Sequence, residues 1–545
     1  MNLLQDKWIT VIRKNGGTEK IAPYQITDQI DSNPIVEIIT PRPDFKGALY
    51  QFLIGLFQTV YAPKNETEWE DNFNTPPSPE DLKKETDKVA FAFDLFGEKI
   101  RFMQDVTIKQ EKQEDLKWLL LDCNEEFFNK RTNLNNVCSS CSATALLTAQ
   151  INSPAGGSGH RTSIRGGGPL STLIRLDENN SEKNLWKNLY LNVLPEKSNL
   201  NDLSNIFLWV NSDNLISVLS SSMTNSDFDN IHSFWAMPRR IFLIENADKE
   251  IQCDVCGEAS KINISKYTSK NHGCNYDKTW THNLSPYKRD EKGELSALLC
   301  KNDSMLYNNW LSVITKTELT QPARVIHYFF EKRDDDSEQA IINSFGYFVK
   351  PGQAKTICWY EGSIPTFKVE HQIQKLYISE AKKFIDAAKS FSSKLYIVIE
   401  KLLCWKLKES DGRVTWEMPE TLKANKQKLK DKWYNKPIFS SAKYSFFKNT
   451  ETEFYKNLTS LQNVVKSGND SNDLLNAWIR FLSDSSLRIF DEYFSNQSIE
   501  YEDIRKNVIA REELRKFEFS SQLKIDIGLL AAAKKKSTTQ GAKKK

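Results

Sequence analysis

Apolar residues along the first 365 positions recur mostly with the period of β-strands. Short apolar, β-like runs predict strands at Trp8–Ile12, Phe207–Val210 and Arg240–Ile244. From about 115 to 365, further short β-like runs alternate with breaks rich in Gly, Asn and Ser. This part of the chain is therefore predicted to be rich in short strands.

One helical stretch and one connection interrupt this pattern near the start of the chain. Between 47 and 61, apolar residues recur at spacings of three and four, which predicts a helix. The stretch 62–85 is rich in Pro, Asn, Thr and acidic residues, and we expect it to form an exposed connection.

Helical periodicity dominates after about residue 365, where glycine becomes rare. Seven apolar residues share one face of the first predicted helix: Ile373, Leu376, Tyr377, Ala381, Phe384, Ile385 and Ala388. Further amphipathic stretches follow at about 418–434, 440–464, 472–494 and 499–523. The pattern predicts a bundle of α-helices as a separate C-terminal domain.

Together these patterns predict an α+β protein. A large mixed α/β domain is expected over 1–366, an all-α domain over 367–528, and a disordered lysine-rich tail over 529–545.

Composition is that of a soluble globular protein. Of 545 residues, 39% are hydrophobic and 11% aromatic, which excludes long-range disorder. No apolar run approaches the ~18 residues needed to cross a bilayer, and the first residues lack the features of a secretory signal. Nine cysteines, an odd number, favour a reducing compartment. We therefore expect a cytoplasmic protein.

The charge balance implies that any nucleic-acid-binding surface is local. The formal net charge is +3, but the last fifteen residues contribute six lysines and no acid. The remainder is thus slightly acidic, and a basic surface would have to be confined to one face. One predicted helix has such a basic face. The alternative explanation is that its lysines only contact solvent. Its lysines are Lys423, Lys426, Lys428, Lys430, Lys432 and Lys436.

Two Cys-x-x-Cys pairs are the strongest candidates for metal chemistry. Cys138 with Cys141, and Cys253 with Cys256, would together complete a tetrahedral zinc site. The alternative is four unrelated buried cysteines. Because four thiolates leave no open position, the zinc would be structural and would pin two distant segments together. Rival ligands that lack the paired spacing are His272, Cys274, His282 and Cys300.

A glycine-rich basic stretch at 155–168 follows the first pair. Glycines let backbone N–H groups approach phosphates or base edges, and Arg161 and Arg165 would add charge-assisted contacts. The spacing is that of neither a P-loop nor a dinucleotide-binding motif. On the residues alone, a surface turn and a nucleic-acid contact explain the stretch equally well. The Asn-rich segment 129–136 is by itself best explained as a solvated loop.

Candidate catalytic groups are sparse. Six histidines are few for an enzyme of this size, and no Ser-His-Asp order or pair of catalytic carboxylates is present. His272 and His282 weakly resemble an HNH nuclease, in which a histidine activates water beside a metal, and packing roles are the alternative. The chain is predicted to be a binding protein and not an enzyme.

Seven short motifs follow one another along the chain: Met1–Ile9, Phe102–Gln104, Cys138–Leu146, Arg165–Thr172, Phe234–Trp235, Cys253–Gly257 and Trp280–Pro286. In this order they resemble the CasA family, the large subunit of the type I-E CRISPR surveillance complex Cascade. The resemblance extends from residue 1 to about 525, and it implies that the helical domain is a four-helix bundle.

The resemblance also implies a non-catalytic function. Members of the family recognise the PAM, a short motif beside the target in double-stranded DNA, and begin duplex opening for R-loop formation. They later recruit a separate helicase–nuclease, while the CRISPR guide RNA reads the remaining sequence. Expected partners are therefore the other Cascade subunits, the guide RNA, double-stranded target DNA and that nuclease.

Two DNA-contacting features of the family match this sequence. The loop that enters the PAM minor groove falls on Gly157, Ser158 and Gly159, with serine where the family has glycine and with Arg161 close behind. A glutamine wedge that splits the first base pair matches Gln353.

Two further features follow from the resemblance. The family's lysine finger falls on Asn271 by ungapped counting, and the neighbouring Lys270 is the alternative. The loop that meets the guide RNA and neighbouring subunits falls just before the first cysteine pair. Its polar residues are Lys130, Arg131, Asn133 and Asn135. A scaffold that only holds other subunits together remains an alternative, and it predicts no discrimination among PAM variants.

Overall fold

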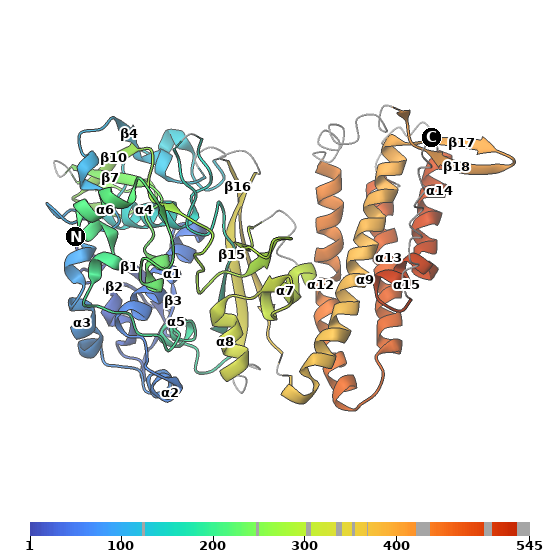
Figure 1. Ribbon diagram of the computed structural model, residues 1–545, viewed down its shortest axis with the longest axis horizontal. Helices are drawn as coiled ribbons and strands as arrows, with labels where there is room; N and C mark the ends of the chain where they lie inside the picture. Colours follow the sequence, from blue (N-terminus) through green and yellow to red (C-terminus); the bar gives the residue numbers. More distant parts are fainter. Residues whose placement is uncertain are drawn as a thin grey trace, which may run out of the picture. The chain divides into compact units, whose positions relative to one another are not determined.

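The computed structural model describes residues 1–122, 126–157, 159–246, 250–300, 307–333, 340–350, 355–367, 369–420, 437–494 and 504–530. The chain divides into two compact units. The first comprises Met1–Lys301 and Ser312–Lys368, and the second comprises Asn302–Leu311 and Val369–Lys545. Strands are concentrated in the first unit and long helices in the second, as Figure 1 shows.

The first unit combines short strands with helices of varied length. Its strands are β1 (Ile9–Arg13), β2 (Thr18–Ile21), β3 (Ile35–Ile38), β4 (Gln113–Asp115), β5 (Ser171–Leu176), β6 (Ser222–Met223), β7 (Arg240–Asn246), β8 (Ile251–Gln252), β9 (Ala259–Ser260), β10 (Asn263–Lys270), β11 (Asn275–Tyr276), β12 (Tyr287–Arg289), β13 (Leu295–Ala297), β14 (Thr320–Gln321), β15 (Ala340–Val349) and β16 (Thr356–Pro365). The helices before residue 368 are α1 (Pro43–Val60), α2 (Glu66–Asn74), α3 (Pro79–Asp87), α4 (Ser139–Asn152), α5 (Leu185–Tyr190), α6 (Ser212–Val218), α7 (Trp310–Ile314) and α8 (Arg324–Lys332).

Four three-stranded antiparallel sheets lie in the described part of the first unit, with strand orders β2-β1-β3, β4-β10-β7, β13-β12-β14 and β16-β15-β5. Strand β5 is buried on both faces. Helix α1 is buried along nearly its whole length and lies against β15, because Gly47 leaves room for the ring of Phe345. The site segments described below lie at the ends of β10 and of the β15–β16 hairpin.

Several of the sequence motifs contribute aromatic rings that pack around Phe52 of α1. The ring of Phe52 lies 5.7 Å from Trp8, 5.9 Å from Phe102 and 6.0 Å from Trp235, measured between ring centroids. The three partners come from three separate motifs and are all buried. Aromatic pairs in such edge-to-face arrangements stabilise a core beyond the burial of their area. These motifs therefore specify the core of the first unit.

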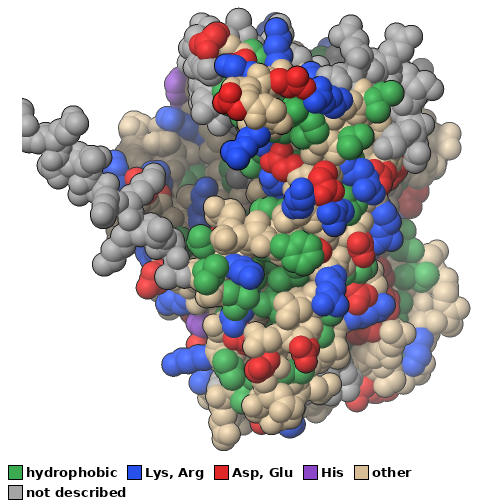
Figure 2. Space-filling view, turned by 90° about the vertical axis from the view of Figure 1, so that its right-hand side faces the viewer, with side chains coloured by type: hydrophobic (Ala, Val, Ile, Leu, Met, Phe, Trp, Pro, Cys, Tyr) green, Lys and Arg blue, Asp and Glu red, His purple; other side chains and the backbone are tan. Residues whose placement is uncertain are grey.

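The second unit is built on helices α9 (His371–Cys404), α12 (Pro437–Lys466), α13 (Asn472–Phe494), α14 (Ile504–Arg515) and α15 (Ser521–Asp526). Helix α9 packs against α12, α13 and α14, and α13 packs against both α12 and α14. The indole N–H of Trp478 on α13 donates to the carbonyl of Phe384 on α9 (2.9 Å). The face of the molecule in Figure 2 mixes basic and acidic side chains.

The mixed α/β character and the helical C-terminal region are confirmed. Strands β1 and β7 and helix α1 lie where the apolar pattern predicts them. On α9, Leu376 is exposed although it was assigned to the apolar face, whereas Tyr377 and Phe384 are buried. None of the helices in the described ranges has the length and apolar character that crossing a bilayer requires.

Two sequence-based predictions need correction, and a third lies mostly outside the described residues. Residues Leu208–Val210 form a 3-10 helix and not a strand, since the run packs into the core from all sides. The stretch 62–85 contains α2 and most of α3, which begin at the caps Asn65 and Ser78. Just before the helix predicted at 418–434, the chain forms the hairpin of β17 (Lys406–Ser410) and β18 (Arg413–Glu417). Residues 421–436, with the six lysines, lie outside the described residues.

Candidate functional site

The first cysteine pair lies where a helix begins. Cys138 is the N-cap of α4 and Cys141 lies one turn further on, so that both thiols emerge at the same end of the helix. The sulfur of Cys138 accepts the backbone N–H of Cys141 at 3.5 Å. The helix start therefore gives both thiols a defined direction.

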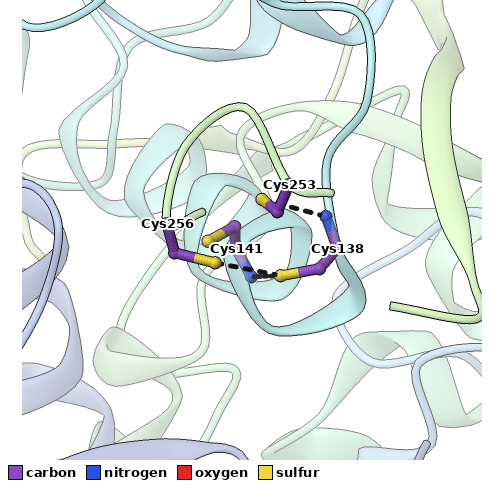
Figure 3. Close-up of side chains that lie close together, drawn as sticks. All are labelled: Cys138, Cys141, Cys253 and Cys256. Carbon is purple, nitrogen blue, oxygen red and sulfur yellow. Dashed lines mark hydrogen bonds between the residues drawn. The ribbon is translucent and has the colours of Figure 1, made fainter. Parts of the chain in front are cut away.

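The second pair lies on the tight turn between β8 and β9. The backbone N–H of Gly257 donates to the carbonyl of Cys253 (2.8 Å), and Gly257 has a φ of 77°, which favours glycine. This turn meets the start of α4, since the backbone N–H of Cys138 donates to the sulfur of Cys253 (3.3 Å). Figure 3 shows the two pairs facing each other.

The four sulfurs fit a tetrahedral metal ion. All lie within 4.8 Å of one another, and those of Cys138 and Cys256 are 3.8 Å apart. Four thiolates at about 2.3 Å from zinc would lie about 3.8 Å apart. Hydrogen bonds, first with Cys138, lower the pKa of Cys253 and raise that of Cys141, because four close thiols cannot all ionise without a cation. The predicted cysteine cluster thus forms, and it can hold a metal.

The second cysteine turn also holds the loop that precedes α4. The carboxylate of Asp254 accepts the backbone N–H groups of Asn135 and Asn136, each at 2.7 Å, and the Asp254 N–H donates to the Asn136 carbonyl (2.8 Å). The backbone N–H of Ile264 on β10 donates to the carbonyl of Val137 (2.9 Å). The end of this loop is therefore tied to the second cysteine turn and to β10.

A buried ion cluster holds the start of the same loop. Arg42 contacts the carboxylates of Asp44 (2.8 Å) and Asp122 (2.6 Å) and donates to the side-chain carbonyl of Asn129 (3.0 Å). Burial disfavours the Arg42 cation, but the two carboxylates outweigh it and raise its pKa. Tyr347 on β15 donates a hydrogen bond to Asp44. Removing one member of such a cluster typically costs about 3–5 kcal/mol.

Between these two anchors lie the residues predicted to contact guide RNA or subunits. Lys130, Asn133 and Asn135 are exposed. The backbone of Arg131–Asn133 forms a short 3-10 turn. The side chain of Arg131 lies outside what the structure describes. The segment is thus held at its ends and presents polar side chains to solvent.

The glycine loop lies against the turn that follows β10. Gly157 has a φ of 89° and Gly159 a φ of 79°. The carbonyl of Gly159 accepts the backbone N–H of His272 (2.8 Å), and a Cβ on Gly159 would lie 2.8 Å from that of Asn271. Glycine at 159 therefore permits the two predicted DNA-contacting segments to touch. Ser158 lies outside the described residues.

The arginines of this region have different environments. Arg165 is buried and donates to Ser171 (2.9 Å) and Ser285 (3.0 Å), and burial lowers its pKa to about 10. Burial therefore does not fit Arg165 to a contact with nucleic acid, which was one of the two explanations that the sequence left open for this stretch. Arg161 is half-buried. Arg239 was not selected as a site residue from the sequence. A signal for it was present, because it is one of two adjacent arginines at the point where a strand was predicted to begin.

Lys270 is the last residue of β10 and is about half exposed. Its ammonium lies 2.6 Å from the carboxylate of Glu111, so it would have to exchange this partner to bind a phosphate. Asn271 is exposed at the following position. Both finger candidates therefore lie beside the glycine loop.

The wedge candidate Gln353 lies outside the described residues, in the sequence between β15 and β16. Lys350 donates its backbone N–H to the carbonyl of Lys355 (2.9 Å), next to the paired ends of β15 and β16. Thr356 bonds to the carbonyl of Leu121, on the segment that also approaches the glycine loop.

The structure does not support the nuclease alternative. His282 is buried, accepts the backbone N–H of Leu284 at its Nδ1 (3.1 Å), and has a pKa lowered by burial and by Arg165. His272 is exposed on the turn after β10. In the described part of the chain, the four-cysteine cluster is the one group of side chains that could hold a metal.

Comparison with solved structures shows the same fold in proteins of distant sequence. A crystal structure of CasA from Thermus thermophilus matches with a TM-score of 0.69 and 14% identity, over 97% of this chain and 100% of that one. Cse1 from Acidimicrobium ferrooxidans gives 0.64 and 14%, over 97% and 98%. A chain of a CRISPR RNA-guided surveillance complex gives 0.66 and 12%, over 95% and 99%.

A family model describes the chain directly. The model of the CRISPR-associated protein Cse1 matches residues 2–489, which include both cysteine pairs, the glycine loop and most of the helical unit. The chain therefore belongs to the Cse1 (CasA) family of CRISPR-associated proteins.

Proposed function

We propose that the chain is the large subunit of a type I-E Cascade complex and that it recognises the PAM and starts duplex opening. The glycine loop would enter the minor groove, Gln353 would act as the wedge, and Lys270 or Asn271 would supply the finger. The protein would have no catalytic role of its own and would recruit a helicase–nuclease after R-loop formation. Family membership and the likeness to a chain of an RNA-guided surveillance complex support this proposal.

The observation that carries the proposal is the contact between the glycine loop and the turn after β10. A glycine loop held beside a polar or cationic side chain suits a minor groove, whose readout is degenerate and rewards close approach. The hydrogen bond from His272 to Gly159 holds the loop at this position.

The cysteine cluster would hold structural zinc. Four thiolate ligands leave no open position, so the ion would stabilise the fold and take no part in chemistry. Through Asp254 the centre would also hold the loop around Asn133, which we assign to guide RNA and neighbouring subunits.

The test is reconstitution of the assembled complex with and without this chain. We expect copurification with other subunits and a short RNA, and R-loop formation on duplexes that carry a PAM. Gln353→Ala should slow opening about tenfold, which corresponds to about 1.4 kcal/mol. Lys355→Ala, a change at the base of the same hairpin, serves as the control. Equal R-loop formation on duplexes with and without a PAM would favour the scaffold alternative and contradict the proposal.

For the zinc site, Cys253→Ser should remove most of the bound metal, because one thiolate ligand is lost. At zinc concentrations a thousandfold above the Kd, this would cost about 4 kcal/mol of stability. Metal content and the unfolding free energy measure the effect. Cys358→Ser, outside the cluster, is the matched control. A metal-free wild-type protein of unchanged stability would refute the structural role.

A further inference from the structure

A cavity of about 460 Å³ opens beside the glycine loop. Its walls come from the loop itself (Gly156, His160), from the end of β10, from the start of β7 and from the segment around Trp118. This volume is within the range of pockets that hold small organic ligands, about 300–1,000 Å³. Of the site residues predicted from the sequence, only Lys270 lines this cavity.

One cation in this cavity has no acidic partner among the described residues. Arg239 donates to the carbonyl of Pro154 (2.6 Å) and contacts Nδ1 of His160 (2.5 Å), while its Nε is buried without a partner. The other cations of the wall are paired, Arg240 with Asp105 (2.6 Å) and Lys270 with Glu111 (2.6 Å). A half-buried guanidinium that has no carboxylate partner favours an anion or another acceptor from a ligand.

The remaining walls suit a flat, partly polar group. Trp118 is a large exposed aromatic side chain (43%), and Tyr267 and the leucines at 119–121 add apolar surface. Glu114 presents a carboxylate that already accepts from Tyr267 (3.2 Å) and Ser269 (2.8 Å) and retains acceptor capacity. Stacking on aromatic rings together with a few hydrogen bonds is how proteins hold an unstacked nucleobase.

We infer that this cavity binds one nucleotide of the DNA that leaves the duplex beside the glycine loop. Its base lies against Trp118 and its polar edge or phosphate meets Arg239. The inference rests on the proposed function, since a nucleotide becomes available here only if the glycine loop lies at the point of opening. The cavity then gives the separated strand a binding site, which favours the open state over reannealing.

The experiment places 2-aminopurine at successive positions of either strand next to the PAM, in the assembled complex. At one position the wild-type complex should show quenched emission after opening, because the base stacks on Trp118. Trp118→Ala should weaken this occupancy about tenfold and restore emission at that position alone. Trp118→Phe should retain most of the quenching.

Phe91→Ala is the matched control, because Phe91 is exposed to a similar extent (48%) and does not line the cavity. Arg239→Gln should lower occupancy in the same way as Trp118→Ala, which tests the polar wall separately. Identical emission at every position in the wild type and in both cavity variants, with PAM-dependent opening intact, would overturn the inference alone. Loss of PAM-dependent opening in the wild type would overturn the proposed function and this inference with it.

Discussion

At the residue scale, the metal centre and the loop before it are connected through one side chain. Asp254 lies between Cys253 and Cys256 and accepts two backbone N–H groups of the loop. The thiols would hold the ion, whereas Asp254 fixes Asn135 and Asn136 relative to the thiols. Structural metals commonly depend on such outer contacts.

Asp254→Ala should loosen this loop without removing the metal. Loss of an acceptor for two N–H groups should cost about 1–2 kcal/mol, and hydrogen exchange at Asn135 and Asn136 should accelerate about tenfold. Asp290→Ala is the matched control, since its exposed carboxylate accepts the N–H groups of Lys292 (2.9 Å) and Glu294 (3.0 Å) in another turn. Unchanged protection at Asn135 and Asn136 would show that Asp254 does not hold the loop.

At the element scale, a buried histidine joins three segments of the first unit. His232 contacts the carbonyl of Ile206 at Nδ1 and the hydroxyl of Tyr276 at Nε2, both at 2.9 Å. Burial lowers its pKa to about 4. The folded protein therefore holds this ring neutral at pH values where an unfolded chain, with a histidine pKa near about 6.5, would protonate it.

This depressed pKa predicts acid sensitivity. The contribution of the neutral ring is fully present above about pH 6.5 and is lost as the pH falls towards about 4, by up to about 3 kcal/mol. His282, whose pKa burial also lowers, acts in the same direction. His232→Asn should flatten the dependence of unfolding free energy on pH in this window. A slope equal to that of the wild type in His232→Asn would contradict this origin.

The sequence predicted well those elements whose residue pattern is compatible with few other structures. Two Cys-x-x-Cys pairs predicted the metal centre because few other arrangements use that spacing. Phe207–Val210 was mistaken for a strand because bulky aromatic residues favour any buried surface, not strands alone. Helices α2 and α3 were missed because each buries only two side chains, although Asn65 and Ser78-Pro79 were visible starting signals.

The cavity could not be predicted, because its walls come from segments far apart in the chain. Trp118, His160, Arg239 and Lys270 share no motif, and only the pairing of β10 with β4 and β7 brings them together. The burial of individual arginines could not be predicted either. Arg161 and Arg165 lie four positions apart, yet only Arg165 is fully enclosed by core partners.

At the scale of the whole molecule, the first unit combines a loop held by the second cysteine turn, a glycine loop and the β15–β16 hairpin, and the second unit consists mainly of helices. The family motifs serve the fold as much as the site, since Trp8, Phe102 and Trp235 meet around Phe52. A protein of this kind can diverge widely in sequence while it retains the fold, as the 12–14% identities to its structural neighbours show.

If the glycine loop reads the PAM, a variant that displaces this loop should lose discrimination between duplexes with and without a PAM. Gly159→Ala adds a Cβ 2.8 Å from that of Asn271 at a φ of 79°, so it should displace the loop. Gly293→Ala introduces a similar strain (φ 82°) in open space and serves as the control.

The measurement is the ratio of R-loop formation rates on duplexes with and without a PAM, in the assembled complex. We expect Gly159→Ala to lower this ratio about tenfold, equivalent to about 1.4 kcal/mol, and Gly293→Ala to leave it at the wild-type value. A wild-type ratio in a folded, fully assembled Gly159→Ala complex would show that the glycine loop does not read the PAM.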